Sequence, residues 1–164
     1  MKTEYIENVT YKLAYRIIRA EPQVILKRNM ILDIPSEVVI TEETPVSLLE
    51  DYFEDKRLSY NTQSPSRKSC LYIFPYSDYW VDRWTKSMFP HMKATYFLLT
   101  LQLNGLISWH DANLFTISGI NPAARERSAK EYWSHCFNSD SLVEGLFKGN
   151  AILVDFEKRE IEFE

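Results

Sequence analysis

Two runs of strand-forming residues in the second half of the chain are separated by a two-residue turn signal. Residues 94–103 are almost all strand-forming, Asn104-Gly105 follows, and Leu106-Ile107-Ser108-Trp109 resumes the pattern. An Asn-Gly pair between two such runs is typical of a β-hairpin, because the central residues of that tight turn adopt positive φ. The sequence therefore predicts a hairpin over residues 94–109, which favours an antiparallel sheet.

Strand patterns also occur at both ends of the chain. β-branched and aromatic residues are the basis of this prediction. The predicted extended segments are Val9–Arg19, Val24–Ile34, Cys70–Phe74, Leu142–Phe147, Ala151–Phe156 and Ile161–Phe163, with a turn at Lys148-Gly149-Asn150.

Three helices are predicted between these strands. Thr44 as N-cap and Pro45 at the first helical position begin one, and Asn121-Pro122 begins another. Tyr76, Trp80 and Trp84 recur four positions apart, as the apolar face of an amphipathic helix requires. Because strands and helices do not alternate regularly, we predict a single α+β domain over residues 1–164, with a split, mainly antiparallel sheet and flanking helices.

Composition excludes some general functions. The 164 residues carry a net charge of -4, which provides no general surface for neutralising nucleic-acid phosphates, although Arg67-Lys68 is locally basic. The N-terminus lacks an apolar stretch of signal-peptide length, and no run is long enough to span a membrane. Cys70 and Cys136 are far apart and lie in apolar surroundings, which favours a reduced, cytoplasmic protein.

The sequence does not match the motifs of several common metal, catalytic and nucleotide-binding sites. His91, His110 and His135 do not have the spacing of metal ligands, so no metal is expected. Cys70 with His110 and Asp111 would be a thiol hydrolase only if the thiol were activated, and Cys70 enters an apolar strand. With four glycines in the chain, neither a Walker loop nor a Rossmann fingerprint is present.

Three polar groups at predicted strands form the main candidate site. Arg16 lies on the first strand, Ser66 and Ser69 lie in the turn before the central strand, and Glu144 begins a strand near the C-terminus. A fixed cation, a hydroxyl and an acid could hold a phosphorylated ligand around a reactive sugar carbon. Each also has a structural interpretation, as a paired strand-end charge or as ordinary turn serines.

Six blocks of the sequence together carry a resemblance to a known family. The blocks are Tyr15–Ile18, Ser64–Ile73, Tyr96–Gly105, Asp111–Phe115, Glu131–Trp133 and Val143–Gly149. In order and spacing, from about Tyr11 to Phe156, they resemble a bacterial family of unknown function that is grouped with the ADP-ribosyltransferase-like fold.

This resemblance implies a site for NAD in a cleft of the split sheet. Arg16 matches the first-strand arginine that binds the phosphates or ribose of the dinucleotide. Ser66 or Ser69 would orient the nicotinamide ribose, and Tyr72 would stack on the ring. Glu144 matches the late-strand acid, which stabilises positive charge on the ribose carbon when nicotinamide leaves.

Two departures from the resembled pattern leave alternatives open. Leu142 stands where transferases that modify arginine often have an acidic or amide residue, and Ser66-Arg67-Lys68-Ser69 replaces the Ser-Thr-Ser pattern of many toxins. The sequence is compatible with an ADP-ribosyltransferase or NAD glycohydrolase. The alternatives are a non-catalytic nucleotide or ADP-ribose binding module, and an interaction protein of an immunity or phage system that has no enzymatic activity. The enzyme and the binding module are favoured over the interaction protein.

Overall fold

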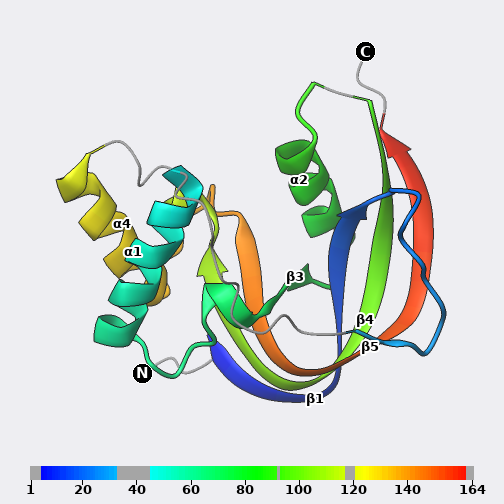
Figure 1. Cartoon of the computed structure of the whole chain (residues 1–164), viewed down its shortest axis with the longest axis horizontal. Helices are drawn as coiled ribbons and strands as arrows, with labels where there is room; N and C mark the ends of the chain where they lie inside the picture. The colour runs from blue at the N-terminus through cyan, green and yellow to red at the C-terminus, as the bar shows by residue number, and fades with distance from the viewer. Residues whose placement is uncertain (1–4, 33–44, 92, 117–120, 162–164) are drawn as a thin grey trace. The chain divides into compact units, whose positions relative to one another are not determined.

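The computed structural model describes residues 5–32, 45–91, 93–116 and 121–161. Five strands, four α-helices and one 3₁₀ turn make up the described part of the chain (Figure 1). In chain order they are β1 (Ile6–Arg19), β2 (Ile31–Leu32), α1 (Pro45–Tyr60), η1 (Arg67–Ser69), β3 (Leu71–Pro75), α2 (Asp78–Met88), β4 (Ala94–Asp111), α3 (Asn113–Thr116), α4 (Pro122–Trp133) and β5 (Val143–Ile161).

The described strands form one hydrogen-bonded sheet in the order β2-β5-β3-β1-β4, with an additional pairing between β5 and β4. β1 pairs antiparallel with β3, so that Tyr15 lies opposite Phe74. β2 pairs antiparallel with β5, so that Ile31 lies opposite Ile152. The α+β class and the mainly antiparallel sheet are confirmed. We predicted a split sheet, whereas the described strands form a single hydrogen-bonded sheet.

The predicted hairpin over residues 94–109 is wrong, because β4 continues through Asn104-Gly105 as one strand. The side chain of Asn104 accepts the backbone N–H of Tyr11 on β1 at 3.1 Å. Tyr11 itself has a φ of 54°, which marks an irregularity in β1, and Gly105 has a φ of 154°. Asn104 therefore satisfies a backbone donor of the neighbouring strand, and no turn forms.

The turn predicted at Lys148-Gly149-Asn150 is also absent, because β5 runs unbroken from Val143 to Ile161. Gly149 has a φ of 149°, a value open to glycine because it lacks a Cβ atom. Glycine at both positions let the strand continue with a local change of backbone direction. The glycines that predict turns in the sequence, Gly105 and Gly149, thus mark irregular positions inside continuous strands.

The chain divides into two compact units at these same positions. The first unit comprises residues 1–8, 34–72 and 106–148, and the second comprises residues 9–33, 73–105 and 149–164. β4 changes unit after Gly105, and β5 changes unit before Gly149.

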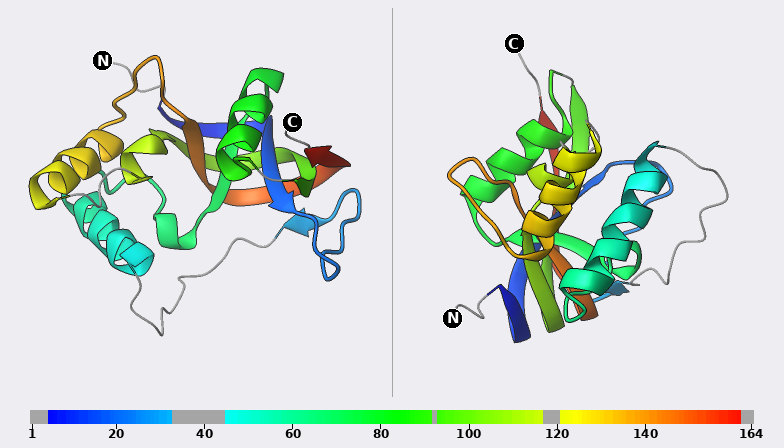
Figure 2. Two further views of the ribbon diagram at one scale, coloured as in Figure 1. Left: turned by 90° about the horizontal axis from the view of Figure 1, so that it is seen from above. Right: turned by 90° about the vertical axis from the view of Figure 1, so that its left-hand side faces the viewer.

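The first unit has a core formed mainly by helices. α1 contacts α4, and the two helices lie side by side in Figures 1 and 2. Asn121 caps α4 by accepting the N–H of Ala124 at 2.8 Å, as predicted from Asn121-Pro122. The predicted cap of α1, Thr44, lies outside the described residues. The buried residues of this core are Phe53, Cys70, Leu114, Ala129, Tyr132, Trp133 and Leu146.

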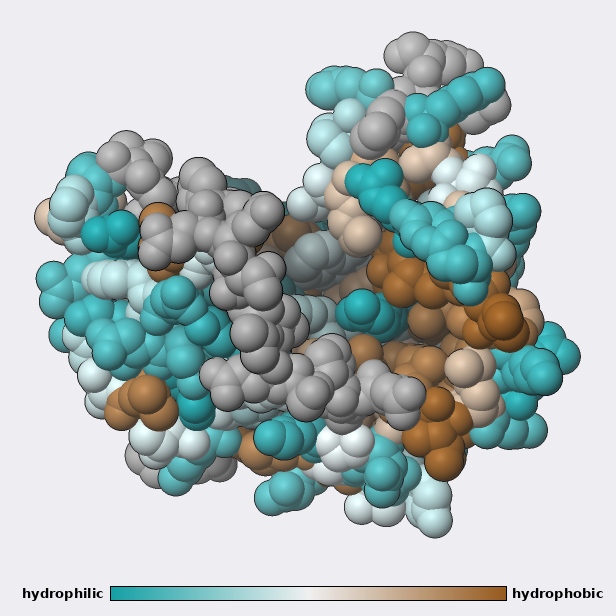
Figure 3. Space-filling view, in the orientation of Figure 1, coloured by the Kyte–Doolittle hydropathy of each residue, from teal (hydrophilic) through white to brown (hydrophobic). Residues whose placement is uncertain are grey.

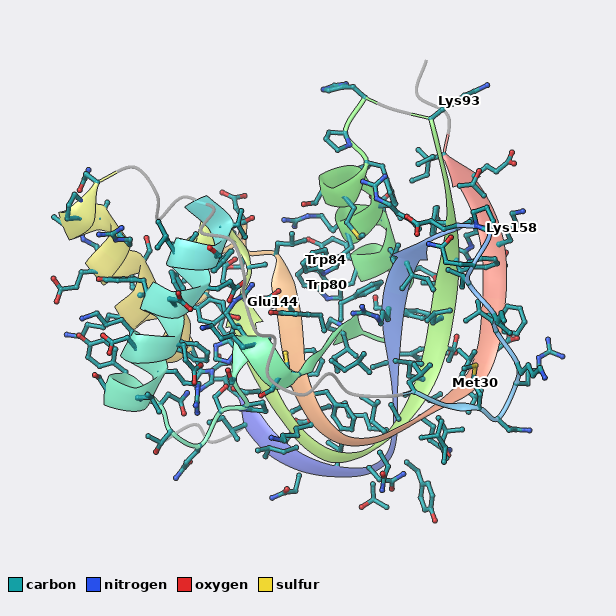
Figure 4. All side chains as sticks on the ribbon, in the orientation of Figure 1. Met30, Trp80, Trp84, Lys93, Glu144 and Lys158 are labelled. Carbon is teal, nitrogen blue, oxygen red and sulfur yellow. The ribbon has the colours of Figure 1, made fainter. Side chains whose placement is uncertain are left out.

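The second unit has a core of aliphatic and aromatic residues between α2 and its strands. The helix predicted from the spacing of Tyr76, Trp80 and Trp84 is confirmed as α2, and Figure 4 shows the side chains of Trp80 and Trp84 extending from it. Tyr76, however, precedes the helix and is exposed, so it does not belong to the apolar face. The surface of this unit includes hydrophobic areas, whereas the surface around α1 and α4 is mostly hydrophilic (Figure 3). The buried residues of this core are Ile17, Phe74, Val81, Phe89, Tyr96 and Leu98.

The segment predicted to be extended over Val24–Ile34 is mostly irregular. Only Ile31–Leu32 forms a strand among its described residues, while residues 33 and 34 lie outside them. Within the described ranges, no helix has both the length and the apolar character needed to cross a membrane.

Candidate functional site

Arg67 lies in η1, a short helical turn that α1 holds in place. Ser66 caps this turn, because its side-chain oxygen accepts the N–H of Lys68 at 3.1 Å. The same hydroxyl donates to Glu54 of α1 at 2.7 Å, and Glu54 forms an ion pair with Arg57. The Arg67 side chain therefore starts from a backbone that is fixed both by its cap and by contact with α1.

Two carboxylates and one phenol bind the Arg67 guanidinium. Nη1 donates to Oε1 of Glu144 at 2.5 Å and to the hydroxyl of Tyr132 at 2.6 Å. Nε donates to Oε2 of Glu50 on α1 at 3.2 Å. Arg67 is 9% exposed, so protein groups rather than water balance most of its charge. One cation thus joins η1, α1, α4 and the start of β5.

Aromatic rings surround the same guanidinium. Its Cζ atom lies 3.9 Å from the ring centroid of Phe115, 5.2 Å from that of Tyr72 and 5.3 Å from that of Tyr132. Ring faces attract cations, most strongly where water is excluded. Burial alone would lower the pKa of Arg67, but the neighbouring Tyr132 and Glu144 raise it well above its ordinary value. We call Arg67, Glu50, Tyr132, Glu144, Tyr72 and Phe115 the arginine cluster.

Glu144 is the buried acid of the arginine cluster and lies at the start of β5 (Figure 4). Its side chain is 7% exposed. Oε1 accepts hydrogen bonds from Arg67 and from Tyr132, the latter at 2.6 Å. Within the described part of the chain, no residue donates to Oε2. One oxygen of this carboxylate is therefore fixed by two donors, and the other is not.

Tyr132 links the two charged groups through its hydroxyl. This hydroxyl accepts a hydrogen bond from Arg67 and donates one to Glu144. Burial raises the pKa of Tyr132 well above its ordinary value, although Arg67 opposes the shift. The phenol therefore keeps its proton at neutral pH and remains a donor to the carboxylate.

His110 packs against the ring of Tyr132. The two rings stack with centroids 4.4 Å apart and an angle of 11° between their planes. Nδ1 lies 2.8 Å from the carbonyl oxygen of Tyr132 and therefore carries the proton, so Nε2 accepts from Ser108 at 2.7 Å. Burial lowers the pKa of His110 well below its ordinary value. The imidazole is thus neutral and in a single tautomer.

His135 continues this buried polar layer. Its ring stacks on His110 at a centroid distance of 4.8 Å. Nδ1 donates to the carbonyl oxygen of Trp109 at 2.8 Å, and Nε2 accepts from the side-chain amide of Asn61 at 3.1 Å. Burial lowers the pKa of His135 as well. Both imidazoles therefore contribute hydrogen bonds without adding positive charge beside Arg67.

Asp111 fixes the chain just before β5. Its Oδ1 accepts the N–H groups of Asn113 and Leu142, at 3.0 Å and 3.1 Å. Its Oδ2 accepts the hydroxyl of Ser141 at 2.6 Å. Since Leu142 precedes Glu144 by two positions, these bonds help to set where the Glu144 side chain begins.

One family model matches residues 6–162, and it describes a protein of unknown function, DUF2441. The chain belongs to this family. The prediction of a family of unknown function is confirmed at that level. No curated protein matches the chain.

The site residues predicted from the sequence fall in both units of this DUF2441 member. Glu144 and Tyr72 lie in the arginine cluster, and the Tyr72 hydroxyl donates to the backbone oxygen of Arg67 at 2.7 Å. Ser66 caps η1, and Ser69 is half-buried at the end of η1. Arg16 is half-buried on β1 in the second unit. The cation that pairs with Glu144 is Arg67.

Cys70 is not activated as the thiol-hydrolase alternative would require. Burial raises the pKa of Cys70 to about 12, although Arg67 opposes the shift. A thiol with this pKa remains protonated at neutral pH, and only the thiolate is an effective nucleophile. His110 uses both of its ring nitrogens in bonds to Tyr132 and Ser108. These contacts argue against a Cys-His pair.

Sequence reasoning missed Arg67, Glu50, Tyr132 and Phe115 as members of the site. The sequence does not single out Tyr132, and it indicates Arg67 only as part of a locally basic pair with Lys68. A usable signal did exist, since Arg67, Phe115, Tyr132 and Glu144 each belong to one of the blocks that carry the family resemblance. Four of the six blocks meet in the first unit, although they are far apart along the chain.

Proposed function

We propose that this protein binds NAD or a related nucleotide and cleaves its glycosidic bond to nicotinamide. In this proposal it is a bacterial, cytoplasmic domain of the ADP-ribosyltransferase-like class, acting as an NAD glycohydrolase or an ADP-ribosyltransferase. The observation that carries the proposal is the environment of Glu144. Arg67 and Tyr132 fix Oε1, while Oε2 accepts no hydrogen bond from a described residue.

The chemistry needs a fixed negative charge near the ribose. When the bond between the ribose anomeric carbon and the nicotinamide nitrogen breaks, its electron pair neutralises the pyridinium ring. Positive charge then develops on the ribose carbon and ring oxygen. A preorganised carboxylate stabilises that charge more than it stabilises the ground state. Glu144 supplies the carboxylate, and Arg67 and Tyr132 hold it in position.

The other residues have supporting roles in the proposal. Arg16 binds the phosphates or ribose of the dinucleotide, as guanidinium groups do through several donors. The hydroxyl that orients the nicotinamide ribose is assigned to Ser69, because the hydroxyl of Ser66 already bonds Glu54 and Lys68. Tyr72, whose ring lies beside the Arg67 guanidinium, stacks on the nicotinamide ring. Because Leu142 is apolar and buried, water or an acceptor other than arginine is the expected ADP-ribose acceptor.

The test compares Glu144→Gln with the unaltered protein. We expect similar NAD affinity by calorimetry but a fall in nicotinamide release of roughly two to three orders of magnitude, because the carboxylate acts mainly on the transition state. Glu126→Gln, which removes an exposed acid of α4, is the matched control and should leave release unchanged. Nicotinamide release that survives Glu144→Gln would remove this residue from the mechanism.

A second candidate function is a binding module without chemistry. It is favoured by the low exposure of Glu144, whose side chain is 7% exposed and already paired with Arg67. Its signature is saturable binding of NAD or ADP-ribose with no nicotinamide release, and with an Arg16→Ala variant that loses the affinity. If neither ligand binds at millimolar concentration, both functions are excluded, and an interaction protein becomes the better interpretation.

A further inference from the structure

Two cations in the first unit converge on one tyrosine ring. The Cζ atom of Arg125 on α4 lies 4.6 Å from the ring centroid of Tyr52 on α1. The Nζ atom of Lys56, one helical turn after Tyr52, lies 5.3 Å from the same centroid. All three side chains are half-buried, so solvent reaches the group. Two positive charges therefore stand within reach of one ring at the contact between α1 and α4 (Figures 1 and 2).

Acidic residues do not compensate these two charges within the described ranges. Neither Arg125 nor Lys56 forms an ion pair or a hydrogen bond there through its side chain. Other cations of the same unit do have carboxylate partners. Arg57 pairs with Glu54, Arg67 with Glu144, and Lys68 with Asp51. Arg125 and Lys56 therefore differ from these cations of α1 and η1, which are paired with carboxylates.

The Nε atom of Arg125 is the second observation. It is buried, and it has no hydrogen-bond partner among the described residues. Leaving a buried donor unpaired costs free energy, and the cost is greater for a charged group. Arg125 also lies near the N-terminus of α4, where the partial positive charge of the helix disfavours a cation. An anion bound beside the guanidinium would offset the charge of Arg125.

We propose that Arg125, Lys56 and Tyr52 form an anion site that binds the phosphate group of a small ligand. A guanidinium presents several donors that match phosphate oxygens, and an ammonium group adds a second positive charge. Both cations lie over the Tyr52 ring, and the ring attracts each of them. This site does not include Glu144, so its test does not depend on whether the protein cleaves the glycosidic bond of NAD.

The test uses the full chain and follows the Nε–H signal of Arg125 by nitrogen-15 NMR during titration with inorganic phosphate and then pyrophosphate. Saturable shifts at Arg125 are expected with both probes at low ionic strength. Arg125→Ala should weaken binding, measured by calorimetry, by about tenfold or more, the equivalent of one charge-assisted hydrogen bond. Lys56→Ala should act in the same direction.

Lys130→Ala is the matched control, because it removes one exposed cation from the same helix. It should change phosphate affinity by less than about twofold, the effect expected of a screened surface charge. An equal loss in Lys130→Ala and Arg125→Ala would mean diffuse attraction to net charge and would overturn the proposal. So would the absence of saturable shifts at Arg125 with either probe.

A third variant, Arg125→Lys, separates a loss of phosphate binding from a loss of folding. It keeps the charge and the contact with Tyr52 but removes the Nε donor, and circular dichroism would establish that the helices are retained. A correctly folded Arg125→Lys variant with weakened phosphate binding supports the guanidinium, rather than positive charge alone, as the group that binds phosphate. Undiminished phosphate binding in this variant and in Arg125→Ala would place the anion elsewhere.

ADP-ribose and phosphate distinguish two sources of the phosphate group. If ADP-ribose competes with pyrophosphate at Arg125, the site serves a nucleotide diphosphate. If phosphate binds at Arg125 but ADP-ribose does not, the ligand is a simple phosphate ester. Either result supports the phosphate site, whereas ADP-ribose binding that leaves the Arg125 signal unmoved, together with no response to phosphate, contradicts it.

Discussion

The two compact units differ in what they bury. Of the buried polar side chains in the described residues, all except Thr85 lie in the first unit, including Arg67, Glu144, His110 and Asp111. Thr85 only bonds backbone oxygens of its own helix, α2. The second unit is thus held together by aliphatic and aromatic packing, which shows that this chain can build a core without buried charge. Because buried charges are costly and are seldom needed for stability, the arginine cluster makes the first unit the place of the candidate site.

The largest expected effect comes from removing the central cation of the first unit. Arg67→Met leaves the buried Glu144 without its counter-charge, and we expect the free energy of unfolding to fall by about 3–5 kcal/mol. The matched change in the second unit, Arg83→Met, removes a cation that contacts Tyr79 and Trp80 on α2. It should cost about 1 kcal/mol or less.

Urea denaturation of both variants measures these losses. Equal losses of unfolding free energy in Arg67→Met and Arg83→Met would contradict this difference between the units. They would mean that burying Glu144 without Arg67 costs little.

An intermediate effect is expected from pH. The pKa of His110 is lowered in the folded protein, so the unfolded state binds more protons as pH falls below about 6.5, the ordinary histidine value. Stability should therefore be complete above that pH and decline below it, by up to about 1.4 kcal/mol per pH unit for each such histidine. His135, whose pKa is also lowered, acts in the same direction.

Substitution tests the contribution of His110 to this pH dependence. Between pH 7.5 and 5.5, His110→Gln should flatten the decline in unfolding free energy. The slope is obtained from denaturation curves at several pH values. A steeper slope in His110→Gln would contradict a neutral, buried imidazole.

The smallest effect is expected for Thr85→Val, in a comparison of single hydroxyl groups from the two units. Thr85→Val in the second unit removes a bond to a backbone oxygen, and we expect a loss of about 0.5–1 kcal/mol. Ser141→Ala in the first unit removes a bond to the Asp111 carboxylate and should cost about 1.5–3 kcal/mol. Thermal unfolding of the two variants checks the order, and a reversed order would show that the charge on Asp111 adds little.

Local sequence patterns predicted the helices well. The spacing of Trp80 and Trp84 gave α2, and Asn121-Pro122 gave the start of α4, because caps and amphipathic faces depend on residues within about one turn of each other. Glu144 at the start of a strand was also predicted and lies in the arginine cluster. Patterns failed at Asn104-Gly105 and at Gly149, where the same residues that form hairpin turns serve an irregular long strand.

The sequence by itself determined the positions of the three main helices and of most strands, the α+β class, and the presence of an acid at the start of β5. Only the tertiary structure decided that Arg67 pairs with Glu144, 77 positions away, and that Tyr132 and His110 support this pair. Secondary structure follows from interactions between near neighbours, whose chemistry can be read along the chain. The arginine cluster depends on which distant side chains share one buried space, and burial is what gives each of their charges a required partner.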